Sequence, residues 1–164
     1  NWVKPSQPGP ADRGLMMFTG TGGRAAVYQW LDLGALSGQA LSYDLSGWLG
    51  GWTTQQDNAL LYVSFLDAGS NEIGHADIGP IAPADRGNQT GLVLRQASGL
   101  LPTGTTSLMF SLSMERIGGG DNDGYADNLS FKLTSAVPEA SSVASLLAGL
   151  GTLALVAGLR RRVG

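Results

Sequence analysis

The sequence predicts an all-β protein, an antiparallel β-sandwich of jelly-roll type, followed by a single C-terminal transmembrane helix. Short stretches of β-branched and aromatic residues recur along residues 1–136 and are separated by turn clusters rich in Gly, Asn and Asp. No segment of that part has the period of a soluble helix. Residues 140–159 then form an uncharged, apolar run. The chain therefore divides into a β-sandwich domain, 1–136, and a tail, 137–164.

The elements of the domain follow one another in a regular order. Residues 1–23 contain Pro5, Pro8 and Pro10 and several glycines, which predicts an irregular lead-in. In the stretch 107–114 the even positions are apolar and three of the odd positions are serine, a pattern typical of a strand with one packed face. The predicted strands are 25–33, 41–49, 59–67, 91–95, 106–114 and 128–133.

Composition excludes several classes of protein. The chain has 164 residues and no cysteine, so disulfides, thiolate metal sites and a Cys nucleophile are absent. Three of its ten basic residues lie in the tail, and one of its thirteen acidic residues is Glu139. The domain therefore has seven basic and twelve acidic residues, which gives it a net charge of about −5. Such a domain lacks the basic patch that phosphate neutralisation needs, so nucleic acid is excluded as a partner.

The tail has three parts in a fixed order. Val137, Pro138 and Glu139 come first, the apolar run 140–159 is long enough to cross a bilayer as a helix, and Arg160, Arg161 and Arg162 follow. By the positive-inside rule the arginines stay cytoplasmic and the domain lies across the membrane. A buried core helix is the alternative interpretation of the run.

This order resembles the PEP-CTERM sorting signal of exported proteins in Gram-negative, exopolysaccharide-producing bacteria. The resemblance covers only the tail, and Ala140 stands where that motif has its second proline. It implies an exosortase-type membrane transpeptidase as partner, which removes the helix and releases the domain to the cell surface or matrix. A permanent single-pass anchor in the inner membrane is the alternative fate. Export also requires a signal peptide, which we expect upstream of Asn1.

A second resemblance covers residues 18 to 133. The order of sequence features is similar to the galactose-binding-like jelly rolls found in many carbohydrate-binding modules. The segments that carry this resemblance are YQWLDL at 28–33, FLDAG at 65–69, LPTGT at 101–105 and GYADNLSF at 124–131. The resemblance implies a jelly-roll fold and a carbohydrate ligand.

The densest acidic cluster lies between residues 121 and 128. Asp121, Asp123 and Asp127 supply carboxylate oxygens on a turn that contains Gly124, and oxygen is the ligand that Ca²⁺ prefers. The spacing is not that of an EF-hand. In the jelly rolls that the chain resembles, the Asp that opens the final strand often joins a structural calcium site, and Asp127 matches that position. The alternative is a polar turn whose side chains cap their own backbone.

A second cluster combines aromatic and polar side chains. Trp52 follows a Gly-Gly turn and precedes Gln55, Gln56 and Asp57, so a stacking surface lies beside groups that can bind sugar hydroxyls. Core packing is the alternative for each indole, and we expect it for Trp48.

Catalysis is not expected. His75 is the sole histidine, no Gly-x-Ser-x-Gly motif is present, and Asp85-Arg86 is more simply interpreted as a surface or loop pair. We therefore predict an exported, non-catalytic surface or matrix protein that binds polysaccharide. A structural matrix protein without specific glycan binding is the first alternative, and a surface hydrolase is the second.

Overall fold

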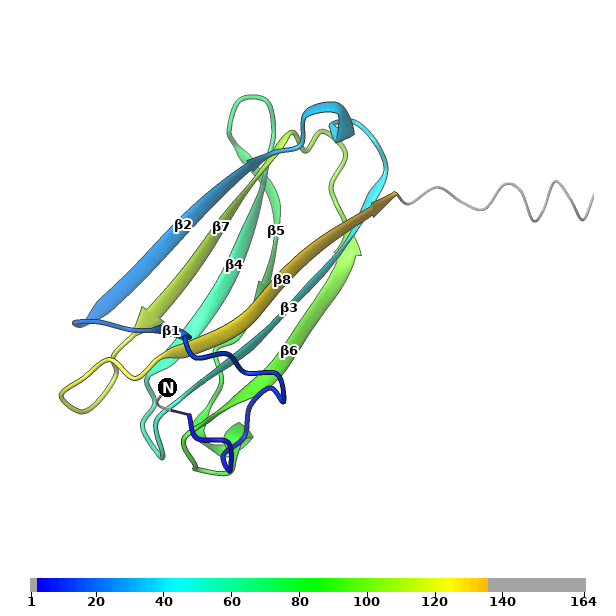
Figure 1. Cartoon of the computed structure of the whole chain (residues 1–164). Helices are drawn as coiled ribbons and strands as arrows, with labels where there is room; N and C mark the ends of the chain where they lie inside the picture. Colours follow the sequence, from blue (N-terminus) through cyan, green and yellow to red (C-terminus); the bar gives the residue numbers. More distant parts are fainter. Residues whose placement is uncertain (1–2, 136–164) are drawn as a thin grey trace, which may run out of the picture.

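The computed structural model describes residues 3–135, which form two four-stranded antiparallel sheets packed face to face (Figure 1). Sheet A has the strand order β1-β8-β3-β6 and sheet B the order β2-β7-β4-β5. This connectivity is that of a jelly-roll-like sandwich, so the predicted all-β sandwich is confirmed. The strands are β1 (Phe18–Thr19), β2 (Arg24–Asp32), β3 (Leu41–Gly51), β4 (Asn58–Leu66), β5 (Glu72–Ile78), β6 (Gly91–Leu100), β7 (Ser107–Glu115) and β8 (Tyr125–Ser135). Two short 3₁₀ helices, η1 (Gly34–Leu36) and η2 (Pro83–Arg86), connect them.

Two strands were not predicted. β1 spans two residues and pairs with the start of β8. β5 carries Glu72, His75 and Asp77 together with Gly74, and this composition hides its alternation in the sequence. It pairs with β4 along its whole length, so tertiary pairing overrides a weak intrinsic preference.

The main core lies between the two sheets. Alternate residues of each strand point inward, and this alternation is clearest in β4, where Ala59, Leu61, Val63 and Phe65 are all buried. Aromatic rings extend the core, and Tyr43 of β3 contacts both Phe65 of β4 and Phe131 of β8. A contiguous apolar core of this kind lets a domain without disulfides fold.

A smaller cluster covers the outer face of sheet A. Val3 of the lead-in packs with Leu92 and Tyr125, and Trp48 packs against this group. The lead-in is attached to β6 by a hydrogen bond from the Leu92 amide to the Pro8 carbonyl, 2.9 Å. The lead-in is therefore irregular as predicted up to β1, but the prediction missed β1 itself, and the expectation that Trp48 packs is confirmed.

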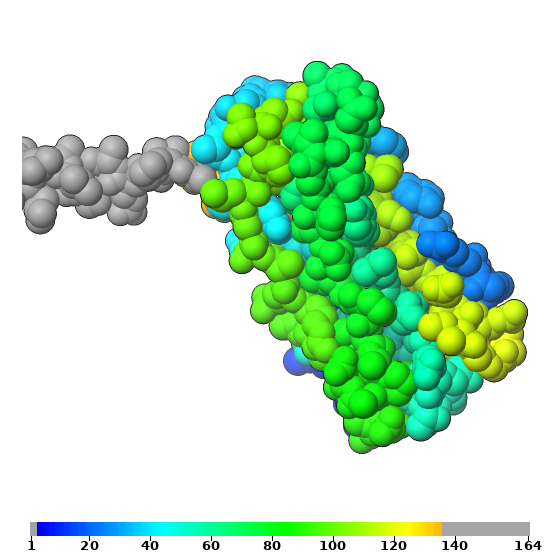
Figure 2. All heavy atoms as spheres, turned by 180° about the vertical axis from the view of Figure 1, so that it is seen from behind, coloured from blue at the N-terminus to red at the C-terminus, as the bar shows by residue number. Residues whose placement is uncertain are grey.

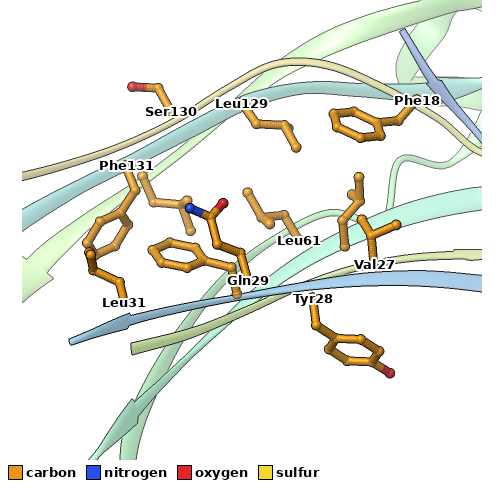
Figure 3. A pocket seen from close by; sticks show the side chains of 12 residues that line it. Phe18, Val27, Tyr28, Gln29, Leu31, Leu61, Leu129, Ser130 and Phe131 are labelled. Atoms are coloured by element: carbon orange, nitrogen blue, oxygen red, sulfur yellow. The ribbon is translucent and has the colours of Figure 1, made fainter. Parts of the chain in front are cut away.

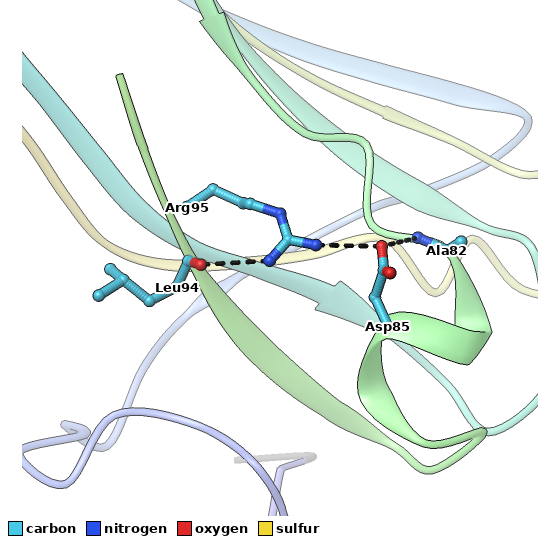
Figure 4. A network of polar contacts seen from close by, with 4 residues as sticks. All are labelled: Ala82, Asp85, Leu94 and Arg95. Atoms are coloured by element: carbon cyan, nitrogen blue, oxygen red, sulfur yellow. Dashed lines mark hydrogen bonds and ion pairs between the residues drawn. The ribbon is translucent and has the colours of Figure 1, made fainter. Parts of the chain in front are cut away.

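Asp85 and Arg86 do not form the surface or loop pair expected from the sequence. Asp85 accepts hydrogen bonds from Arg95 at 3.0 Å and from the Ala82 amide at 3.3 Å, so it joins η2 to β6 (Figure 4). This exposed ion pair contributes little to stability. Arg86, in contrast, is buried.

The predicted sorting tail, 137–164, lies outside the described residues, together with its motif, its apolar run and its arginines. Within residues 3–135 there is no helix with the length and apolar character needed to span a membrane.

Candidate functional site

Three loops meet at one end of the sandwich. They are the β3–β4 loop, 52–57, the β5–β6 loop, 79–90, and the β7–β8 loop, 116–124. The antiparallel topology places them together, because β3, β5 and β7 all end there and β4, β6 and β8 begin there (Figure 1). Binding residues commonly lie on loops that a rigid scaffold holds in place.

Asp57 joins the β3–β4 loop to the β7–β8 loop. Its side chain is 0% exposed, and its Oδ1 accepts hydrogen bonds from the amides of Ile117 at 2.7 Å and Gly118 at 2.9 Å. Its Oδ2 accepts a third from the amide of Asp123 at 3.0 Å. All three donors are backbone groups, so this carboxylate fixes the course of the neighbouring loop without using that loop's side chains.

The pKa of Asp57 reflects two opposing causes. Burial is the largest single influence and raises the pKa, but the three backbone donors and the nearby Arg116 together lower it by more. The resulting pKa lies below the ordinary value of 3.8. The carboxylate is therefore ionised near neutral pH and accepts all three hydrogen bonds as an anion.

Arg86, from the β5–β6 loop, holds the backbone of the β3–β4 loop in place. Its guanidinium donates to the carbonyl oxygens of Thr53 and Gln89, to that of Gln55 at 2.7 Å and to that of Trp52 at 3.4 Å. Burial lowers the pKa of Arg86, and the nearby Tyr125 partly offsets that effect. A guanidinium nevertheless stays protonated in proteins. Arg86 thus stabilises the turn that the backbone hydrogen bond from the Gln55 amide to the Trp52 carbonyl closes.

The start of β8 completes this network. The buried Tyr125 hydroxyl donates to Oδ1 of Asp123 at 2.7 Å, and burial together with that carboxylate raises the pKa of Tyr125. Asn122, also buried, donates to the Met114 carbonyl at 3.1 Å. The β7–β8 loop is therefore held at both ends, which leaves its middle, 118–121, to face the solvent.

A shallow pocket of about 260 Å³ lies between these loops. It is lined by Trp52, Gln55, Gly120, Asp121 and Asp123. The indole of Trp52 is 38% exposed, and Oε1 of Gln55 is buried without a hydrogen-bond partner among the described residues. The pocket therefore combines an aromatic surface, the side-chain amide of Gln55 and two carboxylates, which are groups that can contact a polar ring.

The structure separates the four predicted ligand residues. Trp52 and Gln55 line the pocket, whereas Gln56 is exposed on the loop and does not line it. Asp57 was expected to bind sugar hydroxyls, and this expectation is wrong because its side chain is buried and holds three backbone amides. Asp57 positions the pocket instead of lining it.

The three predicted calcium ligands are also separated. Asp121 and Asp123 lie in the pocket with Trp52, but Asp127 lies within β8 opposite Trp48. Oδ1 of Asp127 accepts a hydrogen bond from the Asn128 amide at 2.9 Å, and the Asn128 side chain donates to Asp12 of the lead-in at 2.9 Å. Residues 3–135 contain no group of three acidic or histidine side chains placed to hold a metal. The expected grouping of Asp121, Asp123 and Asp127 is therefore not found, and calcium binding stays a prediction.

A second, apolar cavity of about 360 Å³ opens between the two sheets at the β2 side. Figure 3 shows Val27, Gln29 and Leu31 of β2 pointing toward Leu129 and Phe131 of β8, while Tyr28 points away. No strand of the described chain lies between β2 and β8 here, because β1 pairs with only the first two residues of β8.

Two features of the domain escaped sequence reasoning, Arg86 at the site and His75 outside it. Arg86 lies in a short loop segment whose neighbours gave no indication of burial. His75 belongs to the unpredicted β5, where its ring stacks on that of Tyr62 with the ring centroids 4.8 Å apart. Its Nδ1 lies 3.4 Å from Oε1 of Glu72. Burial and the Glu72 carboxylate, which accepts from the Tyr62 hydroxyl at 2.7 Å, raise the pKa of Tyr62 to about 12.

Comparison with known proteins gives relatives in fold only. No protein-family model matches the chain, and no curated protein matches it. Among solved structures, the chain is similar to a chain of the T13 IBDV viral particle, with 13% identity and a TM-score of 0.50 over 73% of this chain and 28% of that one.

Two further solved structures have lower scores. The VP2 subviral particle of infectious bursal disease virus gives 11% identity and a TM-score of 0.48 over 73% of this chain and 30% of that one. The enzymatically active domain of tailspike protein 4 of bacteriophage CBA120 gives 16% identity and a TM-score of 0.47 over 72% of this chain and 15% of that one. The chain spans less than a third of each of these three proteins. The likeness to the T13 particle supports the sandwich fold and says nothing about a ligand.

Proposed function

We propose that this protein is an exported, non-catalytic surface or matrix protein whose sandwich domain binds polysaccharide in the pocket at the loop end. The observation that carries the proposal is the arrangement of Trp52, Gln55, Asp121 and Asp123 around one shallow pocket. An indole face can stack on a sugar ring, while amide and carboxylate oxygens accept hydrogen bonds from its hydroxyls.

Two further observations support this proposal. The pocket residues lie on loops whose backbone Asp57 and Arg86 fix, so a ligand meets a preformed surface and little ordering is required on binding. The domain is also acidic and poor in charged residues, which suits an uncharged glycan better than a polyanion.

The Trp52→Ala variant tests the pocket. We expect it to abolish retardation in polysaccharide affinity gels, because it removes the stacking surface. A Trp that is 38% exposed gives up less packing than a core Trp, whose loss would cost about 3–5 kcal/mol. We therefore expect the free energy of unfolding of Trp52→Ala to fall by only about 1–2 kcal/mol.

Gln56→Ala is the matched control for this experiment. Gln56 lies on the same loop and is exposed, but it does not line the pocket, so its replacement should leave retardation unchanged. Gln55→Ala should weaken it. If Trp52→Ala unfolds the domain, or if the intact protein ignores a broad glycan panel that includes the producer's own exopolysaccharide, the binding proposal is wrong.

Delivery to the surface is a separate part of the proposal. The order of Pro138 and Glu139, the apolar run 140–159 and the arginines supports recognition by an exosortase-type transpeptidase. We expect the mature protein to lose everything after about Pro138, because a released apolar tail would aggregate in water. Mass spectrometry of the surface fraction decides this. Peptides from 146–160 in released protein would contradict cleavage, and retention in the inner membrane would favour a permanent anchor.

The structural alternative has an observation of its own. β2 is an exposed sheet edge with large apolar side chains, among them Tyr28 and Trp30. Such an edge favours association between protein chains.

A further inference from the structure

Within residues 3–135, no strand pairs with the outer edge of β2. β2 pairs only with β7 in this part of the chain, so its nine residues form one edge of sheet B. Tyr28 is 65% exposed and Trp30 61%, while Val27 and Leu31 on the opposite face of the strand are exposed as well. In Figure 2 the blue spheres of β2 lie at the margin of the molecule, next to those of β7.

This edge lacks the devices that usually prevent pairing with another strand. β2 contains no proline and no lysine, its register with β7 is uninterrupted, and its only charges, Arg24 and Asp32, are its first and last residues. The other edge of sheet B, β5, carries Glu72 and Asp77 instead.

The edges of sheet A are better protected. On β6, the Leu92 amide donates to the Pro8 carbonyl of the lead-in, and Arg95 carries a charge that pairs with Asp85. β8 is covered at its start by β1 and carries Lys132 further along. Among the described strands, β2 is therefore the edge most open to another strand.

Hydrogen bonds at both ends of β2 determine which of its backbone groups point outward. The Leu33 amide donates to the Thr106 carbonyl at 3.0 Å, and the Arg116 amide donates to the Gly23 carbonyl at 2.9 Å. Odd-numbered residues thus bond to β7, because backbone groups alternate in direction along an antiparallel strand. The even-numbered residues, from Arg24 to Asp32, direct their N–H and C=O groups outward.

We propose that two copies of this chain associate by antiparallel pairing of their β2 strands, with Tyr28 on the two-fold axis. In this register Arg24 of each copy faces Asp32 of the other, and Trp30 faces Ala26. Residues 24, 26, 28, 30 and 32 of each copy direct their backbone N–H and C=O groups away from β7. Each of the five residue pairs can therefore form two hydrogen bonds, which gives about ten backbone hydrogen bonds between the copies.

The register follows from charge and from symmetry. A two-fold axis makes every contact occur twice, so the only arrangement that places both end charges opposite a partner is the one centred midway between Arg24 and Asp32, at Tyr28. Tyr28 is one of the residues with outward groups, so this centre also satisfies the hydrogen-bond pattern. The four aromatic side chains of Tyr28 and Trp30 from the two copies then form one strip on the outer face of the joined sheet.

The absence of cysteine permits a direct test by cross-linking of the full chain in a mild non-ionic detergent. A hydrogen-bonded antiparallel pair on the axis places its two Cα atoms about 5.5 Å apart, within the range of a disulfide. With copper–phenanthroline as oxidant, Tyr28→Cys should form a covalent dimer at least about tenfold faster than Trp30→Cys, whose Cα atoms would lie about 14 Å apart.

The double variant Ala26→Cys, Trp30→Cys controls for the reactivity of the thiol at position 30. It should cross-link readily, because those two positions face each other across the axis. Equal rates for Tyr28→Cys and Trp30→Cys, or no cross-linking of Tyr28→Cys in a protein that still folds, would overturn the proposal.

Charge exchange gives an independent measurement by sedimentation. Arg24→Asp alone and Asp32→Arg alone should each be monomeric, because each places like charges opposite one another twice. An equimolar mixture of the two variants should contain dimers, since every end pair is then of opposite charge. A mixture that stays monomeric, or single variants that still dimerise, would contradict the register. Neither result depends on a glycan, so this test is separate from that of the pocket.

Discussion

Replacing Asp57 by alanine is expected to lower the free energy of unfolding by about 3–5 kcal/mol. The change leaves three partly buried backbone amides, those of Ile117, Gly118 and Asp123, without the carboxylate that accepts from them, and each unsatisfied donor costs about 1–3 kcal/mol before water enters the cavity. Urea unfolding followed by Trp fluorescence measures the effect. A loss below about 1 kcal/mol would show that the loops do not depend on this carboxylate.

Asp57→Asn gives a graded control for the same contact. The amide keeps one oxygen for two of the donors, but its NH₂ group meets the third, so we expect an intermediate loss of about 2 kcal/mol at neutral pH.

The pH dependence distinguishes charge from geometry. The pKa of Asp57 is lower in the folded state than its ordinary value of 3.8. Ionisation of Asp57 therefore stabilises the fold at pH values above 3.8, and this contribution is lost as the pH falls through the folded-state pKa. Asparagine does not titrate. The difference in stability between the wild type and Asp57→Asn should therefore narrow below about pH 4. A constant difference would contradict the charge argument.

Replacing Arg86 by methionine is expected to have an effect of similar size, about 3–5 kcal/mol. Methionine retains much of the aliphatic volume but donates no hydrogen bond, so the carbonyl oxygens of residues 52, 53, 55 and 89 lose their shared donor. The β3–β4 loop should then open. Hydrogen exchange at the Gln55 amide, which donates to the Trp52 carbonyl at 2.9 Å, reports this local change.

Arg86→Lys separates charge from hydrogen-bond geometry. Lysine keeps the positive charge, but its single ammonium group cannot reproduce the planar fork of the guanidinium. We expect it to recover about half of the loss. Full recovery would mean that charge alone holds the loop, and no change in Arg86→Met would mean that the loop is held by other contacts.

The strand pattern of the fold could be predicted because burial follows sequence alternation closely. β7 is the clearest case, with Leu108, Leu112 and Met114 buried inside and serines outside. β5 could not be predicted, because its outward face is charged and the pattern is interrupted by Gly74. Its position depends on pairing with β4, which is a property of the assembled sheet.

The candidate site could be predicted only in part. Trp52 and Asp123 were found separately, from an exposed aromatic and from an acidic turn, but the sequence did not indicate that the two loops share one pocket. Asp57 was misinterpreted because an Asp beside two glutamines has the composition of a ligand loop, while its burial depends on a turn sixty residues away. Long-range contacts of this kind leave no local pattern.

Asp57 and Arg86 bind the surrounding loops only through main-chain atoms. The path of the pocket loops is therefore decoupled from the identity of the side chains that they display, and residues such as 52, 55, 120 and 121 can be randomised together on an unchanged framework. The domain offers a cysteine-free starting point for selecting binders to new targets, in the way that variable loops are diversified on other β-sandwiches.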